Sequence, residues 1–503
     1  MNEHNPVRKE SPLQKLQKLE KLLRESRWVS GIGLLCAAVI TVVTIVFALQ
    51  IWNTKMVPGA WMGYICAGLG AALLGAVALL LNHRHKVRFV LGAVLSVGLA
   101  AALIVGGMAV QRGVDALNRI TSAEKQIEYI GVYVPVNDPI EHLEDAGDYT
   151  FGYFTGMDLA ITDKTMATLS EALEKELDTV GYDTIPSLLD ALFVGDVDAI
   201  IFPDAFFDLL GDMEGYTDAQ SKIRALITLD FEMESGELEK PEMPDHTFTV
   251  YISGIDSRYG LTARSRSDVN ILAHVNTKTR QVLLVSTPRD FYVPLSISDG
   301  VPDKLTHAGI YGVNVSKDTL GMLYGIDIDY YFRVNFEGFE EIIDSLGGVT
   351  VDSEYSFTVG SHSFREGEND LNGKEALIFA RERYSLPGGD RQRGKNQMAV
   401  IQGVINKVLS PEILKNYTSV LEAVEGNFET TVPYELVAEL VRGQLEKGGS
   451  WDIITYSADG RGDSQIPYSM SVYAYVMIPD QNTVDRAKNM IQAMENNETI
   501  TQP

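Results

Sequence analysis

The sequence predicts an α/β protein with three N-terminal transmembrane helices, a small α/β accessory domain and a larger layered α/β (α-β-α) domain. Three observations predict this fold class. The first 110 residues of the 503-residue chain contain three apolar runs without a charged residue. Each run has about 20 residues, the length that crosses a bilayer core as a helix. Strand-like and helix-like patterns then alternate, and a polar, proline-containing stretch at 237–244 divides them into two domains.

The apolar runs are Val29–Leu49, Ala60–Leu81 and Phe89–Val110. Basic residues gather in the N-terminal segment and in the second loop, whereas the first loop carries Lys55 alone. Because cytoplasmic loops are enriched in Lys and Arg, both basic segments are placed in the cytoplasm. The chain is therefore predicted to be a multi-pass protein of the cell membrane. Residues 1–28 form its cytoplasmic segment, residues 29–110 hold the spans, and everything after residue 110 lies outside the cell.

The distribution of charge agrees with this topology. Residues 1–110 carry 11 Lys and Arg against 4 Asp and Glu, a net charge of +7, so the total of −26 leaves −33 for residues 111–503. Such an acidic outer part repels nucleic acid, and we expect no nucleic-acid partner. Both cysteines, Cys36 and Cys66, fall in the apolar runs, so the outer part is predicted to contain no disulfide.

Residues 111–244 are interpreted as a helical stalk followed by the small accessory domain. A run rich in β-branched and aromatic residues predicts a strand at 127–136. A helix is predicted at 163–177, and further strands at 199–202 and 221–231. No cluster of chemically reactive side chains is apparent in this part of the sequence.

Residues 245–450 are predicted to form the larger domain. Its strands are expected at 248–252, 269–275, 281–286, 330–334 and 349–351. Its helices are expected at 315–324, 336–346, 372–382, 392–409 and 433–447. Residues 451–503 are expected to add further strands, a short helix and a mobile tail.

Charged side chains recur at the ends of the apolar strands of the larger domain. The five segments that carry them are ISGIDSR (252–258), RSRSD (264–268), VSTPRD (285–290), ALIFARER (376–383) and GGDRQRGKNQ (388–397). Antiparallel neighbours would bring several of these ends to one edge of the sheet, where α/β proteins often bind ligands. Taken singly, each segment could equally form a surface ion pair or a turn.

The residue types in these segments indicate a phosphate or diphosphate ligand. Arginines around a cleft, with a helix N-terminus nearby, suit such an anion. Asp256 and Asp268 could hold a divalent cation, Mg²⁺, together with substrate phosphate. The sequence has neither the GxxxxGK[ST] phosphate loop nor the GxSxG nucleophile elbow, so it does not predict chemistry based on these two motifs.

The stretch from about 248 to 445 resembles the LytR-CpsA-Psr family of bacterial envelope proteins. The matching segments are ISGIDSR, RSRSDVNILAHVN, VLLVSTPRDFYV, KLTHAGIYG, YYFRVNFEGFEEIIDSLGGVTVD, LNGKEALIFARERY and GGDRQRGKNQ, in the order of the family. The three spans and the extra domain make the chain similar to the capsule-associated CpsA branch. One departure is His307, where a small polar residue such as Asn is expected; we interpret it as a local substitution and not as a substrate contact.

The resemblance implies specific roles for the residues of the larger domain, which would then be the phosphotransferase domain. Asp256 and Asp268 would hold Mg²⁺, and Arg289, Asp268 and Asp290 would be catalytic, with Asp268 or Asp290 as the general base. Asp390 would orient the arginines. The pyrophosphate would be bound by Arg266, Arg289, Arg381, Arg383, Arg391, Arg393 and Gln397. The lipid would lie among Phe332, Phe336, Phe339, Ile342, Ile343, Leu346, Val400 and Ile401, although most of these apolar residues could equally be plain core.

The implied activity is the transfer of a glycopolymer, a capsular polysaccharide or a teichoic-acid-like polymer, from a polyprenyl pyrophosphate carrier to peptidoglycan through a phosphodiester. The implied partners are the lipid-linked glycopolymer, peptidoglycan, the cytoplasmic membrane and the capsule export machinery. Two alternatives stay open. The protein could hydrolyse the polyprenyl pyrophosphate with water as the acceptor, or it could be a non-catalytic scaffold or regulator of capsule assembly that binds the lipid.

Overall fold

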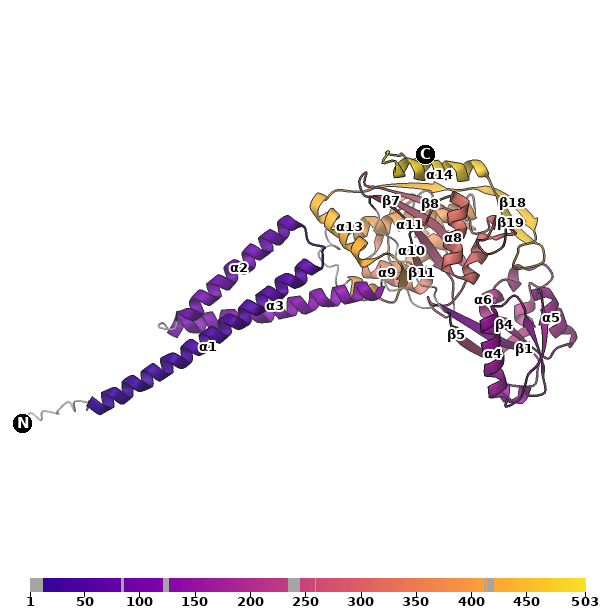
Figure 1. Cartoon of the computed structure of the whole chain (residues 1–503). Helices are drawn as coiled ribbons and strands as arrows, with labels where there is room; N and C mark the ends of the chain where they lie inside the picture. The colour runs from indigo at the N-terminus through magenta and orange to yellow at the C-terminus, as the bar shows by residue number, and fades with distance from the viewer. Residues whose placement is uncertain are drawn as a thin grey trace, which may run out of the picture. The chain divides into compact units, whose positions relative to one another are not determined.

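A computed structural model describes residues 12–82, 86–120, 126–233, 245–257, 259–410, 413 and 420–503. The chain divides into two compact units. The first consists of Met1–Ala116 with Val437–Gly448, and the second of Leu117–Leu436 with Gly449–Pro503. Figure 1 labels the elements of both units.

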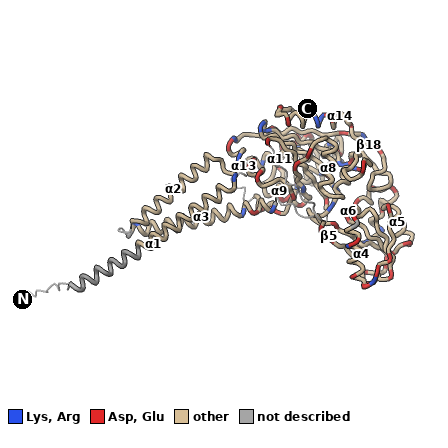
Figure 2. The backbone as a smooth tube through the Cα atoms, in the orientation of Figure 1, with Lys and Arg blue, Asp and Glu red and all other residues tan. Residues whose placement is uncertain are grey.

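The first unit is built from the three long helices α1 (Pro12–Asn53), α2 (Gly59–Leu81) and α3 (Lys86–Ile120). Their parts Ser30–Asn53, Gly59–Leu81 and Val87–Arg119 are long and apolar enough to cross a membrane, so the three predicted apolar helices are confirmed as candidate spans. Where Figure 2 colours these helices by residue type, Lys, Arg, Asp and Glu are few. Many of their large apolar side chains are exposed, as lipid contact requires. The predicted stalk continues α3 as far as Ile120, and residues 121–125 lie outside the described residues.

The second unit begins with the accessory domain, a five-stranded sheet in the order β3-β2-β4-β1-β5. Its strands are β1 (Ile127–Pro135), β2 (Thr150–Phe154), β3 (Asp178–Tyr182), β4 (Ala199–Pro203) and β5 (Ile223–Glu232). Its helices are η1 (Leu143–Ala146), α4 (Leu159–Ala172), α5 (Ile185–Val194), α6 (Asp204–Phe207), η2 (Leu210–Asp212) and α7 (Ala219–Lys222). Antiparallel β1 lies between β4 and β5, and parallel β2 lies between β3 and β4.

Helix α4 differs from its predicted position at 163–177. The Asp158 side chain accepts hydrogen bonds from the backbone N–H groups of Ala160 and Ile161, so the helix begins at Leu159 and ends at Ala172. An aspartate that caps two otherwise unpaired N–H groups fixes a helix start more strongly than the apolar pattern that follows it.

The larger domain is built on a six-stranded sheet in the order β16-β11-β6-β7-β8-β17. These strands are β6 (Thr247–Ile255), β7 (Ser267–Asn276), β8 (Gln281–Ser286), β11 (Tyr330–Asn335), β16 (Phe428–Thr430) and β17 (Asp452–Ser457). Within the described residues, four two-stranded ladders surround the sheet. Their strands are β9 (Tyr292–Pro294), β10 (Pro302–Lys304), β12 (Val349–Ser353), β13 (Phe357–Val359), β14 (His362–Phe364), β15 (Gly367–Leu371), β18 (Gly460–Gln465) and β19 (Ala474–Pro479).

Helices cover both faces of this sheet, as Figure 1 shows. Helices α8 (Val313–Tyr324) and α14 (Gln481–Glu495), with η3 (Leu305–Tyr311) between sheet and α8, pack on one face around Leu272 and Leu283. Helix α11 (Asp390–Val408) packs on the other face around Ile271 and Leu284, next to α9 (Phe336–Ser345) and α10 (Gly373–Arg381). Successive residues of β7 and β8 thus point to opposite layers, and the predicted α-β-α arrangement is confirmed.

Strand pairing brings three of the charged segments to one edge of the sheet. Ile255 at the end of β6 pairs with Ser267 at the start of β7, and Ile271 of β7 pairs with Ser286 at the end of β8. Strand β11 runs parallel to β6, so its last residue, Asn335, reaches the same edge. The antiparallel arrangement inferred from the sequence is therefore confirmed.

The C-terminal segment completes the sheet of the larger domain. Strand β17 runs parallel to β8, so the predicted boundary at residue 450 divides a single sheet. Where the sequence predicted a mobile tail, the backbone N–H of Ile500 donates to the Gln281 side chain at 3.0 Å, and the Gln502 side chain donates to the backbone oxygen of Thr455 at 2.9 Å. A sheet edge that would otherwise be open is covered in this way.

The accessory domain is joined to the larger domain by backbone, ionic and apolar contacts. The N–H of Ile127, at the start of β1, donates to the backbone oxygen of Thr262 at 2.9 Å. The guanidinium of Arg264 donates to the buried carboxylate of Glu128 at 3.0 Å. Buried residues of the larger domain, including Ile310 and Met470, belong to the apolar core of the accessory domain.

We expect Glu128 to make this junction sensitive to pH. Burial raises the pKa of its carboxyl to about 7, although Arg264 opposes the shift. The folded state therefore holds a proton that the unfolded chain has released, and stability falls as pH rises from about 4.5 to 7. Compared with the wild type, Glu128→Gln should be equally stable at pH 5 and more stable at pH 8, by up to about 3 kcal/mol. Thermal unfolding of the detergent-solubilised chain at both pH values measures this difference. If the wild type is more stable than the variant at pH 8, the prediction is wrong.

Candidate diphosphate and lipid site

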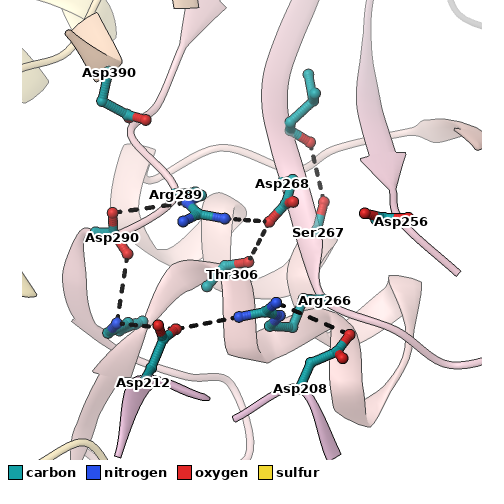
Figure 3. Close-up of polar contacts among 12 residues, drawn as sticks. Asp208, Asp212, Asp256, Arg266, Ser267, Asp268, Arg289, Asp290, Thr306 and Asp390 are labelled. Atoms are coloured by element: carbon teal, nitrogen blue, oxygen red, sulfur yellow. Dashed lines mark hydrogen bonds and ion pairs between the residues drawn. The ribbon is translucent and has the colours of Figure 1, made fainter. Parts of the chain in front are cut away.

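A half-buried ion pair lies at the edge where β7 begins and β8 ends. The Arg289 guanidinium donates to the Asp268 carboxylate at 2.8 Å, and the Thr306 hydroxyl donates to the same oxygen at 3.4 Å (Figure 3). Asp290 lies on the other side, 3.8 Å from Nε of Arg289. This Nε is buried and has no hydrogen-bond partner among the described residues. The arginine is therefore fixed between two carboxylates, with Asp268 at one terminal nitrogen and Asp290 near its Nε.

The charges at this edge alter one another's protonation. Burial raises the pKa of Asp268, but Arg289, Arg266 and Arg393 outweigh burial and hold it below its usual value. Burial lowers the pKa of Arg289, but Asp268 and Asp290 reverse that effect and raise it above its ordinary value. Both groups therefore stay ionised at neutral pH.

Two residues of this edge were not picked out from the sequence. Lys304 is almost fully buried, and its Nζ lies 3.7 Å from Asp290 and 3.7 Å from Asp212. Thr306, which contacts Asp268, is held by a hydrogen bond from its N–H to the backbone oxygen of Arg289 at 2.8 Å. Both belong to KLTHAGIYG, and the lysine that opens this segment in an acidic domain was the signal that could have revealed Lys304.

Helix α10 supplies two arginines. Asn372 and Glu375 form a capping box at its start, and Arg381 is its last residue. The Arg381 guanidinium lies 4.1 Å from the centre of the Phe336 ring, and that of Arg383 lies 4.6 Å from the ring centre of Tyr384. Cations over aromatic faces are stabilised without losing their N–H donors to carboxylates.

Helix α11 brings a further cluster to the same edge. Gly388 and Gly389 have φ values of 87° and 55°, a left-handed conformation that favours glycine and turns the chain into the helix. In the first turns, Asp390 pairs with Arg393 at 2.5 Å. Arg393, Gln397 and Asp390 line one hollow with Asp268 and Arg289. Arg391 also borders it but is half-exposed and pairs with Asp459 at 2.6 Å, so its guanidinium is directed to the C-terminal hairpin.

An apolar cavity of about 340 Å³ lies beside this charged hollow, between the sheet and helices α9, α10 and α11. Six of the eight predicted lipid-contacting residues line it: Phe332, Phe336, Phe339, Ile342, Ile343 and Ile401. The other two, Leu346 and Val400, are buried in the neighbouring core and do not line the cavity. Helical spacing alone could not separate the two groups, because α9 and α11 each face both the core and the cavity.

The cavity and the charged hollow share a wall. Arg381 lines the apolar cavity, and Gln397 lines both spaces. An amphiphile with an apolar tail and an anionic head therefore finds a matching surface for each part.

Asp256 follows the last residue of β6 and faces the same region. Burial raises its pKa, Arg381 opposes that shift, and Asp268 adds to it, which places the two carboxylates in one electrostatic neighbourhood. Within the described residues, no group of three or more His, Cys, Asp or Glu side chains is placed to hold a metal by itself. A carboxylate whose ionisation is disfavoured by a second carboxylate nearby fits Mg²⁺ bound jointly with phosphate oxygens.

His307 has a structural role. It is fully buried, and its Nδ1 lies 2.7 Å from Asp303 and 3.0 Å from the hydroxyl of Ser469. These contacts hold η3 against the C-terminal segment, and they agree with interpreting His307 as a local substitution.

Comparison with known proteins identifies related chains. The model of the LytR_cpsA_psr family matches residues 213–492. The chain is 36% identical over 200 residues to the polyisoprenyl-teichoic acid–peptidoglycan teichoic acid transferase TagU of Bacillus licheniformis, covering 40% of this chain and 64% of the relative. It is 38% identical over 189 residues to TagU of Bacillus subtilis, covering 37% of this chain and 61% of the relative. It therefore spans less than two thirds of the length of these two relatives.

Among solved structures, the crystal structure of B. subtilis TagU has 30% sequence identity and a TM-score of 0.40, and it covers 52% of this chain and 100% of that chain. The crystal structure of B. subtilis TagV has 26% identity and a TM-score of 0.43, with coverage of 51% and 100%.

Proposed function

The chain belongs to the LytR-CpsA-Psr family, whose model matches more than half of it, and from this premise we propose that it is a membrane-anchored glycopolymer–peptidoglycan phosphotransferase. Its donor is a glycopolymer on polyprenyl pyrophosphate, and its acceptor is a hydroxyl of peptidoglycan. The TagU relatives are named as transferases of teichoic acid from a polyisoprenyl carrier to peptidoglycan. The accessory domain and three spans support a place in the capsule-associated branch, with a capsular polysaccharide as the polymer.

The observation that carries this proposal is the shared wall of the apolar cavity and the cationic hollow. A polyprenyl chain fits the cavity, and the diphosphate at its end then lies beside Arg381, Gln397, Arg393 and Arg289. Arg383 and Arg266 extend the cationic surface, and Arg391 stands at its rim. A soluble sugar phosphate would leave the apolar cavity empty, and a lipid without an anionic head would leave the arginines uncompensated.

The chemical step exchanges one phosphate ester partner for another. The acceptor hydroxyl oxygen attacks the phosphorus that carries the glycan, the bond to the bridging oxygen breaks, and polyprenyl monophosphate leaves. Arg289 and Arg393 stabilise the charge that grows on the phosphoryl and bridging oxygens. The hydroxyl proton passes to a carboxylate. The lowered pKa of Asp268 makes that carboxylate a weak base, and we favour Asp290 as the acceptor of this proton.

Mg²⁺ would be held by Asp256 and Asp268, and when bound it would neutralise charge on the diphosphate. The chain's own residues still orient the donor. Arg381 and Gln397 fix the head at the cavity mouth, and Asp390 keeps Arg393 directed into the hollow. For this chemistry the second unit lies outside the cell, where peptidoglycan is assembled.

The proposal is tested with the full chain in detergent micelles, a short oligosaccharide on polyprenyl pyrophosphate, and peptidoglycan fragments, with mass spectrometry of the products. We expect a peptidoglycan–phosphate–sugar adduct that disappears when EDTA removes divalent metal and returns with Mg²⁺. Sugar phosphate formed equally without peptidoglycan would instead identify a hydrolase. A donor that binds tightly but is not converted would favour a scaffold.

A further inference from the structure

The accessory domain reaches the candidate site through two aspartates. Asp212, at the end of η2, lies 3.2 Å from a terminal nitrogen of Arg266, and Asp208, next to α6, lies 3.9 Å from the other (Figure 3). Arg266 directly precedes β7 and is two residues from Asp268. Among the described residues, the ion pairs of Arg266 are all made with the accessory domain.

Asp212 also compensates a second cation. The Nζ of Lys304 lies 3.7 Å from Asp212 and 3.7 Å from Asp290, and the lysine side chain is only 4% exposed. A buried ammonium requires anionic neighbours, because removing it from water is costly. Here one neighbour comes from each domain. Asp212, itself 42% exposed, thus bridges Arg266 and Lys304 from outside the larger domain.

These pairs form a chain of charges from the accessory domain to the proposed reaction centre. Asp212 contacts Lys304, Lys304 contacts Asp290, and Asp290 lies 3.8 Å from Nε of Arg289, which donates to Asp268. If Asp212 loses its charge, Asp290 is the one carboxylate among the described residues that still pairs with Lys304. Asp290 is then drawn towards Lys304 and away from Arg289, while Arg266 loses the nearer of its two carboxylates.

We propose that the accessory domain completes the catalytic site, with Asp212 as a positioning residue for Arg266 and, through Lys304 and Asp290, for Arg289. The inference rests on the proposed function and deepens it, because it assigns part of the site to a domain that the phosphotransferase motifs do not include. Asp208 also orients Arg266, but more weakly, because it lies 3.9 Å away instead of 3.2 Å.

The test compares Asp212→Asn with the wild type as full chains in detergent. The side chain is nearly isosteric and partly exposed, so we expect the variant to fold. Its kcat should fall on the order of 10- to 100-fold, as misplacing a catalytic group without removing it does. The Kd for farnesyl pyrophosphate, a non-reacting probe of the diphosphate site, should rise about tenfold. Asp208→Asn should show smaller changes, and Asp212→Glu should recover most of the activity because it restores the charge.

The matched control is Asp148→Asn, which removes an exposed aspartate of the same domain that pairs with Lys175 at 2.9 Å; its kcat and Kd should stay unchanged. Two results overturn the inference. One is an Asp212→Asn chain that has a lower unfolding temperature but the kcat of the wild type. Asp212 would then stabilise the fold without positioning the site. The other is tighter binding of farnesyl pyrophosphate, which means that Asp212 competes with the substrate for Arg266. The probe measurement separates this inference from the proposed function, because it decides the role of Asp212 even if the wild type transfers no sugar.

Discussion

Replacing Arg289 by alanine should reduce the transfer rate by two to three orders of magnitude, the effect of removing one preorganised donor to developing charge. The guanidinium is held by Asp268 at 2.8 Å, at the edge where the diphosphate is proposed to bind. Because the contact between the guanidinium and the diphosphate strengthens as charge moves onto the phosphoryl group, most of the loss should appear in kcat. Single-turnover rates with a lipid-linked donor measure it directly.

Arg280 provides a matched control for this substitution. It precedes the first residue of β8, at the opposite end of the strand from Arg289, and lies 5.3 Å from the ring centre of Trp451. Arg280→Ala removes the same side chain from the same sheet and should leave the transfer rate within about twofold. Equal losses in both variants would show that the rate depends on the stability of the sheet and not on the site.

A charge placed in the apolar cavity should abolish the preference for long lipid chains. In the wild type, the affinity for prenyl diphosphates should rise steeply from geranyl to farnesyl to geranylgeranyl, because each buried methylene contributes about 0.8 kcal/mol. Ile401 lines the cavity from α11. In Ile401→Lys the buried ammonium opposes the tail, so the affinity should become nearly independent of chain length. Isothermal titration calorimetry with the three diphosphates measures how the affinity changes with chain length.

The same helix offers the control. Val408, the last residue of α11, is 42% exposed and does not line the cavity, so Val408→Lys adds the same charge without reaching the lipid. Its affinity should rise with chain length as steeply as that of the wild type. If the affinity of Ile401→Lys also rose as steeply, the tail would bind elsewhere, and the 340 Å³ cavity would be a packing defect of the domain.

The larger domain could be predicted from the sequence because its strands are marked by apolar runs and its charges by their position at strand ends. The strands β6, β7 and β8 lie within a few residues of their expected bounds. Their antiparallel pairing explains why Asp268 and Arg289 meet. Short strands such as β14 and β16 carry no such run and were not expected.

Contacts between distant segments were beyond sequence reasoning. Nothing in the local pattern around Asp212 indicates that it meets Arg266, because the meeting depends on how two separately patterned domains pack. Leu346 and Val400 are as apolar as the cavity residues, but their side chains pack into the neighbouring core. Arg391 was expected with the other arginines, and its partner Asp459 lies in a hairpin that only the tertiary fold brings alongside.

The position of β17 has a consequence for folding. This strand is formed by residues 452–457, runs beside β8, and is followed by α14, which covers one face of the sheet. Arg289 lies just beyond β8, so its edge of the sheet depends on a segment far downstream in the sequence. Residues 281–286 gain their second neighbouring strand only when residues 452–457 have folded beside them, and a chain cut before residue 452 should hold Arg289 less firmly.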